Sequence, residues 1–129
     1  MTDSGYRLIA ARMDKGALVL TITHPQLRST EFDVVEALRE EMLRALGEAK
    51  AAKVVVDLSA VQQIGSASFR PLLSLRRKVH ESSGLLILCG LQPDVREVFL
   101  VTRLIDAAGT SAATFGVAVD VPAALARLL

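Results

Sequence analysis

Two short apolar runs constrain the fold of this chain more than any other feature. Residues 54–58 read VVVDL and residues 85–89 read LLILC. Runs of this length without polar alternation are typical of strands that are buried on both faces of a sheet. Because helices must then cover both faces, the two runs predict an α/β protein with a mostly parallel sheet.

The remaining segments predict an alternation of strands and helices around these runs. Residues 6–13 and 17–23 flank the turn signal Asp14-Lys15-Gly16, which indicates a hairpin, and a short strand is expected at residues 115–119. Four helices are expected from the spacing of their apolar residues. The residues expected on their buried faces are Phe32, Val35, Leu38, Met42 and Leu46; Phe69, Leu72, Leu73 and Val79; Val95, Val98 and Phe99; and Leu125, Leu128 and Leu129.

The predicted order ββαβαβαβα implies right-handed crossovers and a sheet of four to five strands. We expect residues 54–58 at the centre of this sheet and about four helices, mainly on one side. Thr30 and Asp33 resemble a capping box for the first helix, and Asp120 is expected to cap the last. The 129 residues are expected to form a single domain, 1–129.

Pro71 fixes where the second helix begins. If Ser66 were the N-cap, Pro71 would lie beyond the first turn, where a proline removes a hydrogen bond and clashes with the preceding turn. With Ser68 as the N-cap, Pro71 becomes the third helical residue and its missing N–H costs nothing. We therefore expect Ser66 in the loop, exposed, two residues before the cap. A helix N-terminus favours anions, so Ser66 is suitably placed to carry a reversible phosphate.

Composition argues against several classes of function. The formal net charge is +1, from 15 basic and 14 acidic residues, which gives no support to a nucleic-acid partner. No apolar stretch approaches the roughly 18 residues of a membrane span, and no signal peptide opens the chain. The lone cysteine, Cys89, is expected to be a buried core residue in a protein of the reducing cytoplasm.

The sequence offers no residues for catalysis or for a cofactor. His24 and His80 lie far apart without cysteine or paired carboxylates at ligand spacing, so no metal site is predicted. No phosphate-binding glycine loop and no G-x-S-x-G nucleophile motif is present. Arg70, Arg76, Arg77 and Lys78 form a basic patch, which is either a solvated helix face or a surface for an acidic partner.

Two segments carry a resemblance to a known family. Asp57-Leu58-Ser59 matches an Asp-x-Ser segment that ends the third strand, and residues 65–68 lie where an Asp-Ser-Ser-Gly motif begins the second helix. In these features the chain resembles the STAS domain of anti-sigma factor antagonists, over residues 6–129. Residues 88–93, LCGLQP, and 95–99, VREVF, strengthen the likeness to a bacterial branch common in two-component and phosphatase operons.

The resemblance implies a regulatory binding module that is not an enzyme. The first Ser of the family motif is phosphorylated and falls on Ser66, while the family's Asp, second Ser and Gly are replaced by Gly65, Ala67 and Ser68. The implied partners are an ATP-binding, histidine-kinase-like anti-sigma factor serine kinase and a PP2C-type phosphatase, for a cytoplasmic monomer or weak dimer. The residues expected at the partner surface are Asp57, Ser59, Gly65, Ser66, Ala67, Ser68 and Arg70.

Three other interpretations stay open. Because Gly65 replaces the family's Asp, the chain could be a non-switching STAS scaffold in a signalling or lipid-transport complex. Because Asp57 and Ser59 end a strand, they could be local punctuation, with the Ser59 hydroxyl bonded to nearby backbone. A serine-dependent enzyme is the third and least supported alternative.

Overall fold

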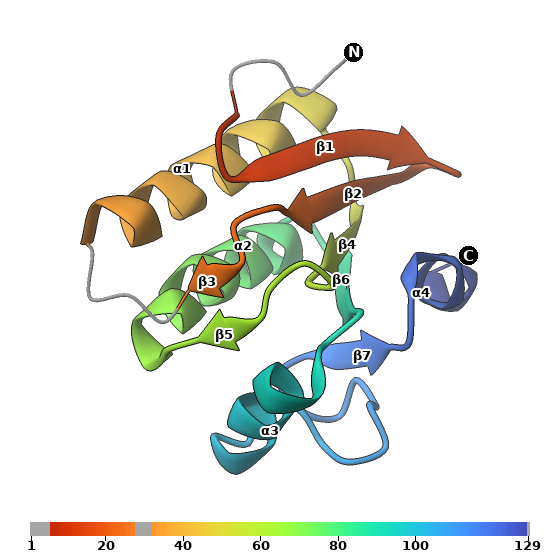
Figure 1. Cartoon of the computed structure of the whole chain (residues 1–129). Coiled ribbons are helices and arrows are strands. Elements are labelled where there is room, and N and C mark those ends of the chain that lie inside the picture. The colour runs from red at the N-terminus through yellow and green to blue at the C-terminus, as the bar shows by residue number, and fades with distance from the viewer. Residues whose placement is uncertain (1–5, 28–31, 129) are drawn as a thin grey trace.

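A five-stranded sheet forms the centre of the molecule (Figure 1). The computed structural model describes residues 6–27 and 32–128. The strands lie in the order β1-β2-β4-β6-β7, with bounds β1 Ile9–Asp14, β2 Ala17–Ile22, β4 Lys53–Asp57, β6 Leu85–Cys89 and β7 Gly116–Ala118. The first pair is antiparallel and the other pairs are parallel. The predicted hairpin and the central place of the VVVDL strand are therefore confirmed.

The hairpin between β1 and β2 turns at two residues. Lys15 and Gly16 both have positive φ angles, 52° and 82°, between the paired residues Asp14 and Ala17. Two consecutive positive φ angles are the signature of a two-residue turn that matches the twist of the strands, and glycine adopts the second one without strain.

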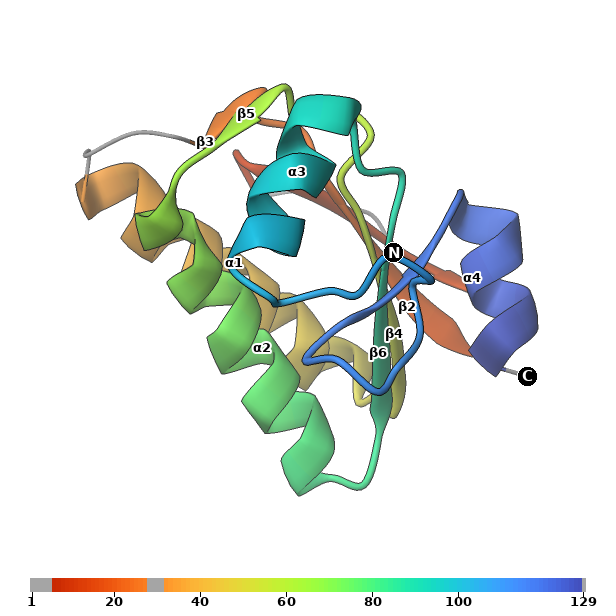
Figure 2. The same cartoon turned by 90° about the horizontal axis from the view of Figure 1, so that it is seen from below.

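In the described part of the chain, four α-helices cover the sheet, and they are distributed unequally over its two faces (Figure 2). Their bounds are α1 Phe32–Ala49, α2 Phe69–Glu81, α3 Pro93–Val101 and α4 Val121–Leu128. The first three pack on one face and α4 packs alone on the other. Within β4, Val54 and Val56 face the large core under three helices, whereas Val55 contacts the smaller core under α4. This is why the strand is apolar without alternation.

Most residues predicted on buried helix faces are buried. Leu73 is a correction, because its side chain is 39% exposed while the adjacent Leu72 is 1% exposed. Each helical residue advances by about 100°, so Leu73 points away from the face that Leu72 buries. The predicted roles of Thr30 and Leu129 lie outside the described residues, as does that of the side chain of Phe32.

A second, two-stranded sheet was not predicted. β3 (Gln26–Leu27) pairs in parallel with β5 (Gln63–Ile64). Segments of two residues are too short to carry a periodic pattern, so the predicted order lacks them. In Figure 1, β5 carries the chain from the end of β4 to the start of α2. Its pairing with β3 therefore fixes the position of the chain just before that helix.

Candidate functional site

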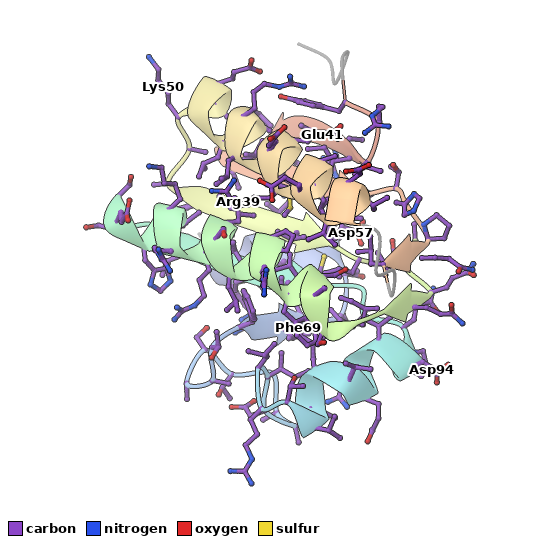
Figure 3. The ribbon with its side chains drawn as sticks, turned by 90° about the vertical axis from the view of Figure 1, so that its left-hand side faces the viewer. Arg39, Glu41, Lys50, Asp57, Phe69 and Asp94 are labelled. Carbon is purple, nitrogen blue, oxygen red and sulfur yellow. The ribbon has the colours of Figure 1, made fainter. Side chains whose placement is uncertain are left out.

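Two of the predicted site residues, Asp57 and Ser59, lie where β4 ends. Together with Gly90 and Gln92, which follow β6 and were not predicted at the site, they form what we call the strand-end cluster. Asp57 is half-buried at the end of β4, as Figure 3 shows. Its Oδ1 accepts the backbone N–H of Ser59 at 2.9 Å. The Gln92 side-chain amide donates to the Ser59 carbonyl at 2.7 Å, which ties the loop after β4 to the start of α3.

Gly90 belongs to this cluster for steric reasons. Its φ is +70°, and a Cβ there would lie 2.8 Å from Asp57 Oδ1 and 3.0 Å from Ser59 Cβ. Any side chain would displace the carboxylate that holds Ser59. The cluster is therefore closely packed, and its hydrogen bonds are directed at its own backbone.

Cys89 is the last residue of β6 and pairs with Asp57 in the sheet register. Burial raises the pKa of its thiol to about 12, and the negative charges of Asp57 and Asp120 add to the shift. The thiolate is the reactive form, so this cysteine is unreactive at neutral pH, as expected of a core residue.

The second group forms a turn, which we call the serine turn and define as residues 65–68. Gly65 precedes a 3₁₀ turn, Ser66–Ser68, that runs directly into α2. Ser66 and Ala67 are exposed. Ser68 is the N-cap of α2 and Pro71 is its third residue, as predicted. Ser66 lies in the 3₁₀ turn rather than in irregular loop, because such a turn commonly precedes a helix.

Ser68 does not belong to an exposed surface. Its side chain is 1% exposed and its hydroxyl donates to the carbonyl of Leu27, with no capping bond to the helix. A buried hydroxyl can support the turn from inside but cannot contact a docked protein. The Ser68 side chain is therefore not part of the exposed surface of the serine turn.

The structure keeps the two groups apart. Among the described residues, no hydrogen bond or ion pair joins the strand-end cluster to the serine turn, and β5 lies between them in the chain (Figure 1). The asymmetry is clear in chemical terms. In the strand-end cluster, side chains of Asp57 and Gln92 bond the backbone of the exposed Ser59, whereas in the serine turn the buried Ser68 bonds the distant Leu27 carbonyl beside the exposed Ser66.

The predicted basic patch is divided. Arg70, Arg77 and Lys78 are exposed on α2. Arg76 is half-buried, and its Nε donates to the Thr114 carbonyl at 2.6 Å. Arg76 therefore supports the segment before β7, which leaves Arg70 as the exposed cation that follows the serine turn.

Sequence reasoning missed residues whose roles depend on distant partners. Glu41, labelled in Figure 3, is 7% exposed on α1 and accepts the backbone N–H groups of Arg7 and Leu8 at 3.0 and 2.8 Å. This carboxylate fixes the chain entering β1 to the helix. Nothing in the pattern of α1 distinguishes Glu41 from the surface acids around it.

Within residues 6–27 and 32–128, no three His, Cys, Asp or Glu side chains gather closely enough to hold a metal ion. Among the helices of the same part of the chain, none is both long and apolar enough to cross a membrane.

Comparison with known proteins decides the family. The family model of the STAS domain matches residues 9–114, which include every strand and helix described above except β7 and α4. The chain belongs to the STAS domain family. The predicted resemblance is therefore confirmed, together with the α/β architecture that it implies.

Relatives of this STAS domain are anti-sigma factor antagonists. BtrV of Bordetella bronchiseptica, whose name assigns it provisionally to that class, is 37% identical over 73 residues, which cover 54% of this chain and 63% of BtrV. The chain thus matches less than two thirds of that relative's length.

Solved structures share the fold of this STAS domain. An anti-sigma-factor antagonist STAS protein from Planctomyces limnophilus is 25% identical with a TM-score of 0.73, covering 94% of this chain and 97% of that one. The Bacillus cell fate determinant SpoIIAA in its phosphorylated form is 16% identical with a TM-score of 0.64, covering 94% and 99%. The relatives named here are anti-sigma factor antagonists, and this chain shares their STAS domain and its fold.

Proposed function

We propose that this STAS domain switches between protein partners according to the phosphorylation of Ser66. In the unphosphorylated state, the face formed by the serine turn and the exposed side of α2 binds an anti-sigma factor serine kinase and releases the sigma factor. The kinase then phosphorylates Ser66, the interface weakens, and a PP2C-type phosphatase restores the first state. The domain is the substrate in this cycle.

The exposure of Ser66 in an otherwise anchored turn is the observation that carries the proposal. Residues on both sides of it are held: the Gly65 N–H donates to the Leu27 carbonyl at 3.0 Å, and Ser68 is buried. A phosphoacceptor must present its oxygen to a kinase without unfolding its own domain. Of the serine turn, only Ser66 has a hydroxyl that is exposed.

The charges around Ser66 suit a phosphate. Ser66 begins the helical run that continues through α2, and there is no acidic residue in the first turn of either segment. The helix dipole therefore favours a negative charge here. Arg70 is exposed in the first turn of α2 and is the first cationic residue after Ser66 in the chain. An Arg–phosphate pair would hold the modified side chain on the protein surface.

The phosphoryl transfer itself needs no group from this chain except the Ser66 hydroxyl. Its Oγ forms a bond to the γ-phosphorus of ATP, the bond to ADP breaks, and the hydroxyl proton passes to a base of the kinase. The product carries about −1.5 to −2 charge at neutral pH. Burying that charge in the kinase interface without a new cation is unfavourable, so the phosphorylated domain dissociates.

SpoIIAA shares this fold at 16% sequence identity, and its structure is of the phosphorylated form. A protein with this fold can therefore accept a phosphate and stay folded.

Gly65 favours a second candidate function, because the resemblance places an Asp at this position in the family motif. Without that carboxylate, this domain could bind its partner constitutively, as a scaffold in a signalling or lipid-transport complex.

Phosphate labelling tests the two candidates. We expect a histidine-kinase-like partner kinase with radiolabelled ATP to label the wild type and not Ser66→Ala, with both proteins binding the kinase. Ser82→Ala is the matched control, because Ser82 is also an exposed serine, at the far end of α2. Mass spectrometry of the labelled wild type should place the phosphate on Ser66.

A charged mimic tests the effect on binding. Ser66→Asp should weaken kinase binding roughly tenfold or more, because an unpaired carboxylate would lie in the interface. Ser82→Asp places the same charge at the exposed far end of α2 and should bind like the wild type. A wild type that binds tightly but takes no label would establish the scaffold function. Label that survives Ser66→Ala would show that another residue is the acceptor.

A further inference from the structure

Both ends of the serine turn are attached to one backbone oxygen. The Leu27 carbonyl accepts the N–H of Gly65 at 3.0 Å and also the hydroxyl of Ser68. The turn is closed internally by the N–H of Ser68, which donates to the Gly65 carbonyl at 3.0 Å. Ser66 and Ala67 therefore lie on a short arc whose two ends share a single anchor.

The anchor is a fixed part of the molecule. The Leu27 side chain is 1% exposed in the large core, and its residue pairs with Ile64 in the small β3–β5 sheet. The carbonyl of Pro25 accepts the N–H groups of Gln62 and Gln63 at 2.7 and 3.2 Å, which extends the same pairing. A group bonded to the Leu27 carbonyl is thus held in place relative to the core of the protein.

The Ser68 hydroxyl serves this anchor and no other role. It makes no capping bond to α2, although its residue is the N-cap. Every buried side-chain nitrogen or oxygen in the described part of the chain has a hydrogen-bond partner, so the bond to Leu27 satisfies this hydroxyl in a site from which water is excluded. In the family motif this position is a glycine, which cannot make the bond.

The geometry points to Ser68 as the positioning residue of the phosphoacceptor turn. Its bond to the Leu27 carbonyl holds the turn in the one conformation that presents Ser66 outward, and it supplies rigidity where Gly65 and Ala67 contribute no side-chain hydrogen bond. This inference rests on the proposed function of Ser66. It assigns Ser68 an indirect part in phosphoryl transfer, because a buried side chain does not touch the kinase.

Amide exchange tests the anchor without any partner. In Ser68→Ala, we expect the Gly65 and Ser68 amides to exchange about two- to tenfold faster, the factor that one hydrogen bond of ordinary net strength represents. Amides of β4 and β6 should be unchanged. Ser74→Ala is the matched control, since it removes a hydroxyl from a half-buried position of α2 beyond the turn. Unchanged exchange at Gly65 in Ser68→Ala would overturn the inference.

Steady-state phosphorylation tests what the anchor does for Ser66. With the partner kinase, Ser68→Ala should lower kcat, by at most the factor seen in amide exchange, and leave KM unchanged, because the docking surface is intact while fewer molecules present Ser66 correctly. A change in KM alone, or an unchanged kcat despite faster exchange, would contradict the positioning role. If the wild type takes no phosphate, the proposed function fails, and the exchange result alone decides whether Ser68 anchors the turn.

Discussion

The strand-end cluster and the serine turn are close in the sequence but are held in place in different ways. Both contain exposed serines, and the sequence predicts both at the partner surface. In the strand-end cluster, the carboxylate of Asp57 and the amide of Gln92 are used to hold the backbone of Ser59. In the serine turn, the holding group is the buried Ser68, and the outer residue Ser66 is left exposed. The two groups therefore differ in where the holding bonds lead: to a neighbouring loop in the strand-end cluster, and to the core in the serine turn.

The largest effect is expected from the helix on which the serine turn rests. Leu72→Ala should lower the free energy of unfolding by roughly 2–5 kcal/mol, because Leu72 is 1% exposed in the large core and the truncation leaves a cavity. Chemical denaturation measures the loss. Leu73→Ala is the control on the adjacent, 39% exposed residue and should cost less than about 1 kcal/mol. Equal losses would show that the two faces of α2 are not distinct.

A smaller effect should show how closely the strand-end cluster is packed. Gly90→Ala should destabilise the protein by at least about 2 kcal/mol, since it combines a positive φ with a Cβ placed 2.8 Å from Asp57 Oδ1. Gly16→Ala is the control that measures the cost of the positive φ without a steric clash, because Gly16 also has a positive φ but its Cβ would meet nothing within 4 Å. Its expected cost is about 1 kcal/mol. If both variants lose the same stability, the cluster yields to a side chain and is not closely packed.

The smallest effect compares the two groups directly. Asp57→Ala removes the acceptor for the Ser59 N–H and should cost about 1 kcal/mol. Ser66→Ala should change stability by less than about 0.5 kcal/mol, because its side chain is exposed and supports nothing else in the fold. Thermal or urea unfolding measures the loss of stability in each of the two variants. A destabilised Ser66→Ala would mean that this serine has a structural role as well.

Much of the site followed from local rules. The missing N–H of Pro71 placed the start of α2 correctly and put Ser66 outside it, exposed. The burial of Cys89 also followed from its apolar run. The inward orientation of Ser68 did not, because whether a turn serine faces solvent or core depends on what lies beneath it. Here the atom beneath it is a carbonyl 41 residues earlier in the chain.

The sequence by itself determined the order of the main elements, the central strand and the face of each helix, since these depend on repeats of two or 3.6 residues and on the sterics of proline and glycine. Only the tertiary structure decided which polar groups meet. Gln92 bonds the carbonyl of Ser59, which is 33 residues earlier in the chain, and Glu41 accepts the N–H of Leu8, which is also 33 residues earlier. β3 and β5 form because their neighbours bring them together, each being too short to form alone. Such contacts depend on how whole elements pack, and no local pattern records that packing.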